Sequence, residues 1–344
     1  MLKYLNSYVS ILKKDPAFRN SFVKNVLFLS AKKFRNSVSP GKSELVIINL
    51  SEHMGDIIAA EPISRHLRSL YPAATLIWCV NNRFTELVRY NPALNGLLSV
   101  TCIAEWILIK KLFSPWIRMV DLLPDGRSCG TYKLTNRNKS KSGLSVFNYL
   151  EQHNLLQAFA DAGGLTEVED ETPLFHFSGN EKDEVVFHFE YIVLHTLAND
   201  PQRNWSPEQW NLLLSRLLDS YPDLHVVEIG LESILHNSSP RFHNIANKYN
   251  LQQIAHIIKR SVLFIGVESG FAHFANALGT SSIVLIGHYQ HYRNYQVYSG
   301  RFATGEGVSL HYHPGQLKHL DMENVWPKVE SRLDNLRNSR LMRI

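Results

Sequence analysis

The stretch Val262–Gly287, "VLFIGVESGFAHFANALGTSSIVLIG", contains a complete strand–helix–strand pattern. The apolar runs "VLFIG" and "SIVLIG" are typical of buried strands, and the segment around His273 between them has helical character. A helix that joins two such strands makes them neighbours in a parallel sheet, so the stretch predicts an α/β fold. Four chemically distinctive residues lie where the first strand gives way to the helix: Glu268, Ser269, Gly270 and His273.

The same alternation of strands and helices occurs in two separate parts of the chain. The first run has expected strands over 44–50 and 74–80, with a helical pattern over 57–70 between them. The second has expected strands over 191–197 and 224–230 and expected helices over 206–222 and 250–261, ahead of the opening stretch. Two such runs predict two α/β domains. With the acidic stretch 166–173 near the linker, we expect domains over residues 43–175 and 176–344, after a basic amphipathic extension over residues 1–42.

Composition is that of a globular protein. Of the 344 residues, 44% are hydrophobic and 19% are charged, which excludes an intrinsically disordered chain. The three cysteines, Cys79, Cys102 and Cys129, are far apart and odd in number. They indicate neither a disulfide framework nor a zinc site, and we therefore expect a reducing cytoplasm.

Positive charge is concentrated at the two ends of the chain. Residues 1–42 contain nine basic residues and one acidic residue, and residues 326–344 contain five basic and two acidic residues. A nucleic-acid-binding protein would more often spread basic charge over its folded body, so we expect no nucleic-acid partner. Apolar residues in the first segment recur at helical spacing: Leu5, Tyr8, Val9, Leu12, then Phe18, Phe22, Val26 and Leu29. This pattern fits either an anionic membrane surface or packing on the protein's own body.

The position of Glu268, Ser269 and Gly270 favours a ligand site. In open α/β sheets, ligands bind at the carboxyl ends of the strands. The start of the following helix offers backbone N–H groups and a positive dipole end, both suited to a diphosphate, and Gly270 lets the backbone come close to it. The structural alternative is a helix that Ser269 simply caps, with His273 as a core residue.

The first domain has a comparable turn in "NLSEHMGDII", residues 49–58. Met54 and Gly55 lie in this turn, and Asp56 follows near the expected helix start. The structural alternative for Asp56 is an ordinary helix N-cap. Neither the glycine pattern of dinucleotide-binding proteins nor the phosphate-binding loop of nucleoside triphosphatases is present.

Several motifs occur together in an order that is typical of one family. They are Gly55-Asp56, Pro62, Tyr71-Pro72 and Asn91-Pro92 in the first half, and Arg203 before Trp205-Ser206-Pro207, "VESGFAHFA" and "HLDMENVWPKV" in the second. Across residues 44–100 and 190–330, the chain resembles the ADP-heptose:lipopolysaccharide heptosyltransferases of glycosyltransferase family 9. The stretch "VESGFAHFA" is similar to the family's Asp-Ser/Thr-Gly-x-x-His-x-Ala signature.

This resemblance implies a GT-B architecture, with two Rossmann-like domains facing a central cleft. It implies inverting transfer of a sugar, heptose first among candidates, from a nucleotide diphosphate donor such as ADP-heptose to a lipopolysaccharide or related glycan acceptor. The acceptor would be a glycan or lipid-linked molecule, and the enzyme would lie in the cytoplasm or peripherally on the inner face of the plasma membrane.

The resemblance also implies roles for single residues. Asp56 matches the general base, beside Met54 and Gly55, and Arg203 matches the cation that binds the diphosphate. The remaining donor-binding residues on this basis are Thr196, Glu232, Glu268, Ser269, Gly270 and His273. Because the sequence has no Asp-x-Asp motif, we expect no metal and no cofactor besides the nucleotide-sugar substrate.

The sequence departs from the family pattern in ways that bear on the donor. Glu268 replaces the usual Asp, Arg203 replaces the usual Lys, and the segment after Gly287 differs. Three alternatives therefore stay open: a transferase of another nucleotide sugar, a nucleotide-sugar epimerase on the same fold, and a non-catalytic carbohydrate-binding relative.

Overall fold

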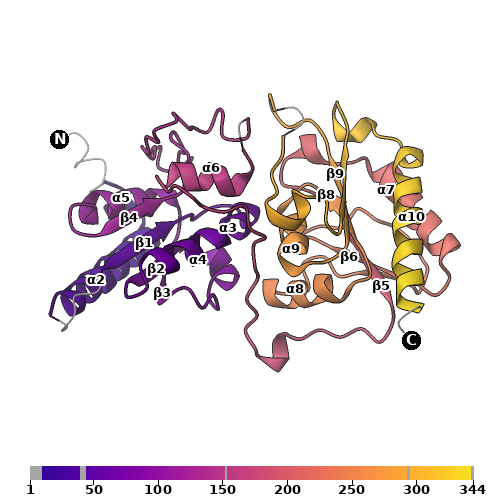
Figure 1. The fold of residues 1–344 in the computed structure, drawn as a ribbon, viewed down its shortest axis with the longest axis horizontal. Helices are drawn as coiled ribbons and strands as arrows, with labels where there is room; N and C mark the ends of the chain where they lie inside the picture. The colour runs from indigo at the N-terminus through magenta and orange to yellow at the C-terminus, as the bar shows by residue number, and fades with distance from the viewer. Residues whose placement is uncertain (1–9, 39–43, 152, 293–294, 342–344) are drawn as a thin grey trace. The chain divides into compact units, whose positions relative to one another are not determined.

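A computed structural model describes residues 10–38, 44–151, 153–292 and 295–341. The chain divides into two compact units, Met1–Asp170 and Glu171–Ile344 (Figure 1). The division lies close to the boundary expected at residue 175, and the segment 1–42, expected as a separate extension, is counted within the first unit.

The first unit is built on a four-stranded parallel sheet. Its strands are β1 (Leu45–Asn49), β2 (Thr75–Asn81), β3 (Gly96–Val100) and β4 (Arg118–Asp121), in the order β3-β2-β1-β4. All residues of β1 are buried, as its continuous apolar run requires. The sequence predicted β1 and β2, whereas β3 and β4 are less uniformly buried.

Helices of the first unit follow the strands in α/β order. They are α2 (Pro16–Val38), α3 (Met54–Ala59), α4 (Glu61–Leu70), α5 (Ile103–Phe113) and α6 (Leu155–Ala162), with a 3-10 helix, η1 (Asn82–Leu87). The single helix expected over 57–70 is wrong, because the chain forms α3 and α4 with a break at Ala60. Pro62 lies in the first turn of α4, where its missing N–H costs no helix bond.

Helix α2 packs against the body of the first unit. It contacts β3, α5 and β1, and it buries Phe18 and Leu29. Asn25 Nδ2 donates to the Ser99 carbonyl at 2.7 Å and to Glu105 Oε1 at 2.6 Å. The inner face of α2 therefore packs on the protein itself; Leu5, Tyr8 and Val9 lie outside the described residues.

The second unit contains a six-stranded parallel sheet. Its strands are β5 (Tyr191–His195), β6 (His225–Ile229), β7 (Phe242–Asn244), β8 (Phe264–Val267), β9 (Ser282–Ile286) and β10 (Val308–Tyr312), in the order β10-β9-β8-β5-β6-β7. The chain runs from β5 to β6 on one side and later returns to β8 on the other. The carboxyl ends of β5 and β8 therefore form a topological switch point, the usual ligand position in such sheets.

Long helices cover both faces of this sheet. They are α7 (Pro207–Ser220), α8 (Leu251–Arg260), α9 (Gly270–Leu278) and α10 (Met322–Leu341), with short 3-10 helices η2 (Glu181–Asp183), η3 (Pro201–Arg203), η4 (Gly300–Phe302) and η5 (Leu317–His319). Helices α7 and α10 pack together on one face, and α8 and α9 on the other (Figure 1). The Ser206 hydroxyl caps α7, and Asn250 and Gln253 form a capping box at α8. The sequence predicted α7, α8 and α9.

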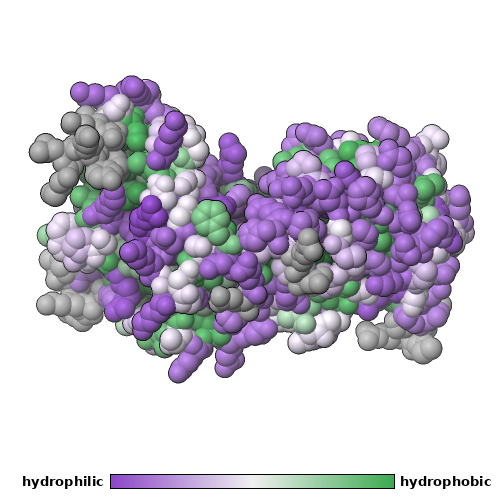
Figure 2. Space-filling view, turned by 90° about the horizontal axis from the view of Figure 1, so that it is seen from above, coloured by the Kyte–Doolittle hydropathy of each residue, from purple (hydrophilic) through white to green (hydrophobic). Residues whose placement is uncertain are grey.

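Hydrophilic side chains cover most of the face shown in Figure 2, with hydrophobic side chains in smaller patches among them. Across the described residues, no helix combines the length and the hydropathy that crossing a membrane requires.

Candidate active site

The start of α9 lies at the carboxyl end of β8. Ser269 occupies the N-cap position, but its hydroxyl makes no bond to the helix backbone. Instead, Ser269 Oγ lies 3.1 Å from Nδ1 of His195, the last residue of β5. The interpretation of Ser269 as a simple helix cap is therefore wrong. Without a side-chain cap, the first turn of α9, beginning at Gly270, keeps the N-terminal character that suits an anion.

Arg203 is brought to this helix start from a distant part of the sequence. Its Nη1 lies 2.7 Å from Glu268 Oε2, and its guanidinium lies 4.8 Å from the centre of the Tyr289 ring. The Tyr295 hydroxyl donates to the same Glu268 oxygen at 3.3 Å. A cation, a carboxylate and two phenol rings thus meet beside α9.

The electrostatics of Arg203 favour an anionic ligand. Burial alone would lower the pKa of Arg203, but the Glu268 carboxylate raises it above the usual value, so the guanidinium stays charged. Its Nε is buried and has no hydrogen-bond partner among the described residues. A buried guanidinium nitrogen of this kind is costly unless a ligand or water pairs with it. Phosphate oxygens are suited to a guanidinium, which can bind them through two nitrogens.

Two buried histidines lie beside this cluster. His195 packs edge-on against Phe271, and the His273 ring lies 4.7 Å from that of Tyr298. Burial lowers the pKa of His195 to about 3 and that of His273 to about 4, so both rings are neutral near pH 7. The Tyr298 hydroxyl is buried without a hydrogen-bond partner in the described part of the chain.

These histidines should make the protein less stable in mild acid. The unfolded chain takes up a proton near pH 6.5, whereas the folded chain resists until about pH 4 at His273 and about pH 3 at His195. The stability that the two neutral histidines contribute is therefore fully present above pH 6.5 and is lost as the pH falls below 6.5. At pH 5 we expect a loss of about 2 kcal/mol of unfolding free energy per histidine.

Urea unfolding at pH 7 and pH 5 measures this loss. His273→Gln should make the free energy of unfolding less dependent on pH, and His236→Gln, at an exposed position, should leave the dependence as in the parent. Equal pH dependence in the parent and in His273→Gln would show that His273 does not carry the effect.

A second set of contacts orders the loop after β6. The buried Glu228 carboxylate accepts hydrogen bonds from the Thr196 hydroxyl at 3.0 Å, from the Ser233 hydroxyl, and from the Ile234 backbone at 3.2 Å. Thr196 is fully buried, so its contacts place it among the residues that hold this loop. Glu232 is exposed on the same loop.

In the first unit, the carboxyl ends of β1 and β4 meet at a buried charged group. Asp121 accepts from Asn49 Nδ2 at 2.8 Å and from Asn136 Nδ2 at 2.9 Å, and it pairs with Lys110 Nζ at 2.6 Å. Since a buried carboxylate is tolerated when it is paired and hydrogen-bonded, Asp121 ties these strand ends together. Within the described ranges, no group of three or more His, Cys, Asp or Glu side chains could hold a metal ion.

Asp56 lies in the first turn of α3, together with Met54 and Gly55. The N-cap residue of α3 is His53, with a φ of 62° and no side-chain cap bond, so the interpretation of Asp56 as an N-cap is wrong. A non-glycine residue in that backbone region is uncommon and marks a constrained turn.

Arg127 adds positive charge beside Asp56. Its Nε donates to Glu52 Oε2 at 3.2 Å, and its guanidinium also contacts His53 Nε2. Burial alone would lower the pKa of Arg127, but the carboxylates of Asp56 and Glu52 raise it. Asp56 therefore lies within the electrostatic field of a guanidinium. Sequence patterns did not predict this partner, because Arg127 lies in the segment 101–165 that matched no motif.

The structure thus gathers part of the expected donor site. Arg203, Glu268, Ser269 and His273 form one cluster at the switch point, and Gly270 begins the helix beside them. Thr196 contacts the neighbouring loop, and Glu232 lies on that loop. Four participants were not expected: His195, Glu228, Tyr289 and Tyr295. The tyrosines lie in the unusual stretch "HYQHYRNYQVYSG" after Gly287, whose aromatic content was the available signal.

Comparison with known families finds one match over part of the chain. The sequence model of glycosyltransferase family 9 (heptosyltransferase) matches residues 155–298, which include the Arg203–Glu268 cluster and α9. Over these residues, the chain is similar to glycosyltransferase family 9. No curated protein sequence matches.

Solved structures of family 9 enzymes have a similar fold. A family 9 glycosyltransferase from Veillonella parvula has a TM-score of 0.62 at 14% identity, covering 85% of this chain and 97% of its own. The heptosyltransferase WaaC of E. coli, solved with ADP, has a TM-score of 0.59 at 15% identity, and the match covers 84% of this chain and 99% of WaaC. The ADP-heptose LPS heptosyltransferase II of E. coli has a TM-score of 0.58 at 16% identity, and the match covers 85% of this chain and 99% of that enzyme.

These findings confirm two expectations. The protein is a glycosyltransferase, and its fold of two parallel-sheet units matches that of GT-B-like heptosyltransferases. At such identities the solved structures establish the fold alone.

Proposed function

We propose that this enzyme transfers a heptose from ADP-heptose to a lipopolysaccharide or related glycan acceptor, with inversion and without a metal. The observation that carries the proposal is the charged Arg203 beside the uncapped start of α9, with a buried Nε that has no hydrogen-bond partner among the described residues. The related E. coli WaaC was solved with ADP, which supports an adenosine diphosphate donor.

The second unit, proposed over residues 176–344, would bind the donor. The backbone N–H groups at Ser269 and Gly270 would meet one side of the diphosphate, and Arg203 the other. A guanidinium has five N–H donors, so Arg203 can keep its bond to Glu268 and still bind phosphate. Glu268 would then fix the guanidinium and lie near the sugar.

The nucleoside would lie over the loop that Glu228 orders. Glu232, exposed on this loop, would accept hydrogen bonds from the ribose hydroxyls. Thr196 would contribute indirectly, since its hydroxyl donates to Glu228. His273, neutral and packed on Tyr298, would offer a ring nitrogen to the donor without adding charge.

The first unit, proposed over residues 43–175, would bind the acceptor. As the oxygen of the acceptor hydroxyl bonds to the anomeric carbon, Asp56 would take the proton from that hydroxyl. The bond from that carbon to the diphosphate oxygen breaks, and ADP leaves with the electron pair. Arg203 and the start of α9 would stabilise the charge that develops on the diphosphate. Met54 and Gly55 would set the backbone that presents Asp56.

The acceptor would be lipid-linked or a glycan carried on a membrane. The enzyme would therefore work in the cytoplasm at the anionic inner face of the plasma membrane, where the basic residues near its two ends favour binding.

Thermal unfolding in the presence of nucleotide sugars tests the donor assignment. ADP-heptose and ADP should raise the melting temperature. At a hundredfold excess over Kd, either ligand should add about 2.7 kcal/mol to the free energy of unfolding. UDP-N-acetylglucosamine should have no such effect. Product analysis should then find ADP released together with a glycosylated acceptor. Stabilisation by uridine nucleotides alone, or conversion of the sugar without an acceptor, would contradict the proposal.

A further inference from the structure

The outer face of α2 exposes a row of apolar side chains. Val23, Leu27 and Phe34 are 48%, 65% and 67% exposed. Their spacings of four and seven residues place them along one side of the helix. They lie away from Phe18 and Leu29, which pack inward. Helix α2 is thus apolar on two sides, and the inner side alone is needed for packing.

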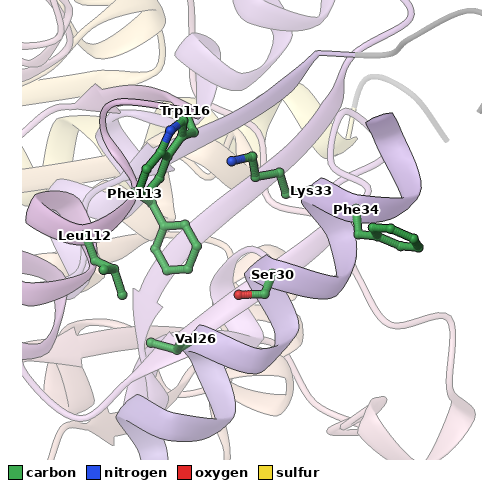
Figure 3. A pocket seen from close by; sticks show the side chains of 7 residues that line it. All are labelled: Val26, Ser30, Lys33, Phe34, Leu112, Phe113 and Trp116. Atoms are coloured by element: carbon green, nitrogen blue, oxygen red, sulfur yellow. The ribbon is translucent and has the colours of Figure 1, made fainter. Parts of the chain in front are cut away.

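This row continues onto the end of α5. Val26, Ser30 and Lys33 of α2 face Leu112, Phe113 and Trp116 across an open pocket of about 410 Å³, which Phe34 also lines (Figure 3). Leu112 is 43% and Trp116 61% exposed. We call Val23, Leu27, Phe34, Leu112 and Trp116 the α2–α5 surface.

Basic residues border the α2–α5 surface. Helix α2 contains five basic residues and no acidic one: Arg19, Lys24, Lys32, Lys33 and Arg35. Helical spacing places Lys33 on one side of the apolar row and Lys24 and Arg35 on the other. Lys33 Nζ lies 4.5 Å from the centre of the Trp116 ring, so a positive charge lies directly beside an exposed indole. Indole rings and lysines together are typical of the polar–apolar boundary of a bilayer.

We propose that the α2–α5 surface inserts its apolar side chains into an anionic lipid bilayer, while the bordering lysines and arginines bind the lipid headgroups. The inference rests on the membrane location proposed above and specifies the surface responsible. Charge decides between occupants, because a second copy docked face to face would bring two sets of five basic residues together. An anionic bilayer complements the same charges.

Removing the N-terminal segment would not test this inference. Deletion of α2 would expose the core that Phe18 and Leu29 fill. It would also remove the hydrogen bond from Asn25 to Glu105. Substitutions confined to the exposed face avoid that damage. Leu27→Gln with Phe34→Gln removes the two most exposed side chains of α2 and keeps every basic residue.

Flotation with lipid vesicles is the first measurement. The full chain should bind phosphatidylcholine vesicles that contain phosphatidylglycerol, and bind pure phosphatidylcholine vesicles weakly. The Leu27→Gln/Phe34→Gln variant should bind about tenfold more weakly or worse, since each lost side chain forfeits its transfer into lipid. The matched control, Leu212→Gln/Phe147→Gln, changes the same residue types at positions 52% and 75% exposed and should bind like the parent.

Trp116 provides a second, local measurement. Of the six tryptophans, Trp116 is exposed, and the other five are at most 3% exposed: Trp78, Trp106, Trp205, Trp210 and Trp326. Vesicles with brominated acyl chains should therefore quench the emission of Trp116 selectively. Trp116→Phe should lose most of the quenching while it keeps much of the binding.

Three results would overturn the inference. They are equal vesicle binding by the double variant and the parent, the absence of Trp116 quenching in bound protein, and a parent dimer that the double variant converts to monomer. The last would assign the surface to a second copy of the chain. Titration with ADP separates this from the proposed transferase function, since ADP binding without vesicle binding would refute the membrane surface alone.

Discussion

Asp56→Asn is expected to lower turnover about 10²–10⁴-fold while the variant folds and binds ADP like the parent. The amide has nearly the shape of the carboxylate but cannot accept the acceptor's proton. Because Asp56 lies half-exposed in the first turn of α3, the change leaves the buried core intact. Initial rates of ADP release and calorimetric titration with ADP measure the two quantities separately.

Glu52→Gln is the matched control for Asp56. Glu52 is bound to the same Arg127 guanidinium, at 3.2 Å, so its removal changes the local charge by the same amount. If Asp56 acts as the base, Glu52→Gln should reduce turnover by less than about tenfold. Near-normal turnover in Asp56→Asn, or equal losses in both variants, would exclude the role of Asp56 as base.

Arg203→Ala is expected to weaken ADP binding by about 10²-fold, since it removes a partly buried charge from the diphosphate. The affinity for adenosine, which lacks the phosphates, should fall far less. Gly270→Val should abolish ADP binding, because a branched side chain at the start of α9 would occupy the space where the backbone meets the phosphate. Calorimetric titration with ADP and with adenosine provides the comparison.

Arg216→Ala controls for the loss of a stacked, ion-paired arginine. Arg216 pairs with Glu323 at 2.7 Å and lies 4.6 Å from the Trp326 ring, an arrangement like that of Arg203 with Glu268 and Tyr289. The Arg216→Ala variant should bind ADP like the parent. If Arg203→Ala and Gly270→Val also bind ADP as tightly as the parent, the donor diphosphate lies elsewhere, and the Arg203–Glu268 pair is structural.

The sequence by itself determined the parallel α/β architecture. Strands such as β1 and β9 contain apolar runs and are buried throughout, and α7 and α8 begin with side-chain caps that join residues three apart in sequence. Such signals depend on local contacts, so a single segment contains them. Local signals were weaker for β3, β4 and α5, whose positions depend on neighbours already in place.

The composition of the cluster around Arg203 was decided by the tertiary structure. Arg203 and Glu268 are 65 residues apart, and Ser269 and His195 are 74 apart, yet each pair is in direct contact. Sequence predicted Ser269 either as a cap or as a ligand contact, and only the position of β5 beside β8 shows that its hydroxyl pairs with His195. The order of strands in a sheet is a long-range property that helix and strand periodicity cannot specify.

The two faces of α2 illustrate the same division. Sequence showed that the segment is basic and amphipathic, and it left two placements open, on a membrane or on the protein. Only the packed structure shows that Phe18 and Leu29 fill the core while Leu27 and Phe34 remain exposed beside Trp116. Hydrophobicity fixes which side chains avoid water, but whether protein covers them depends on the surface against which the helix packs.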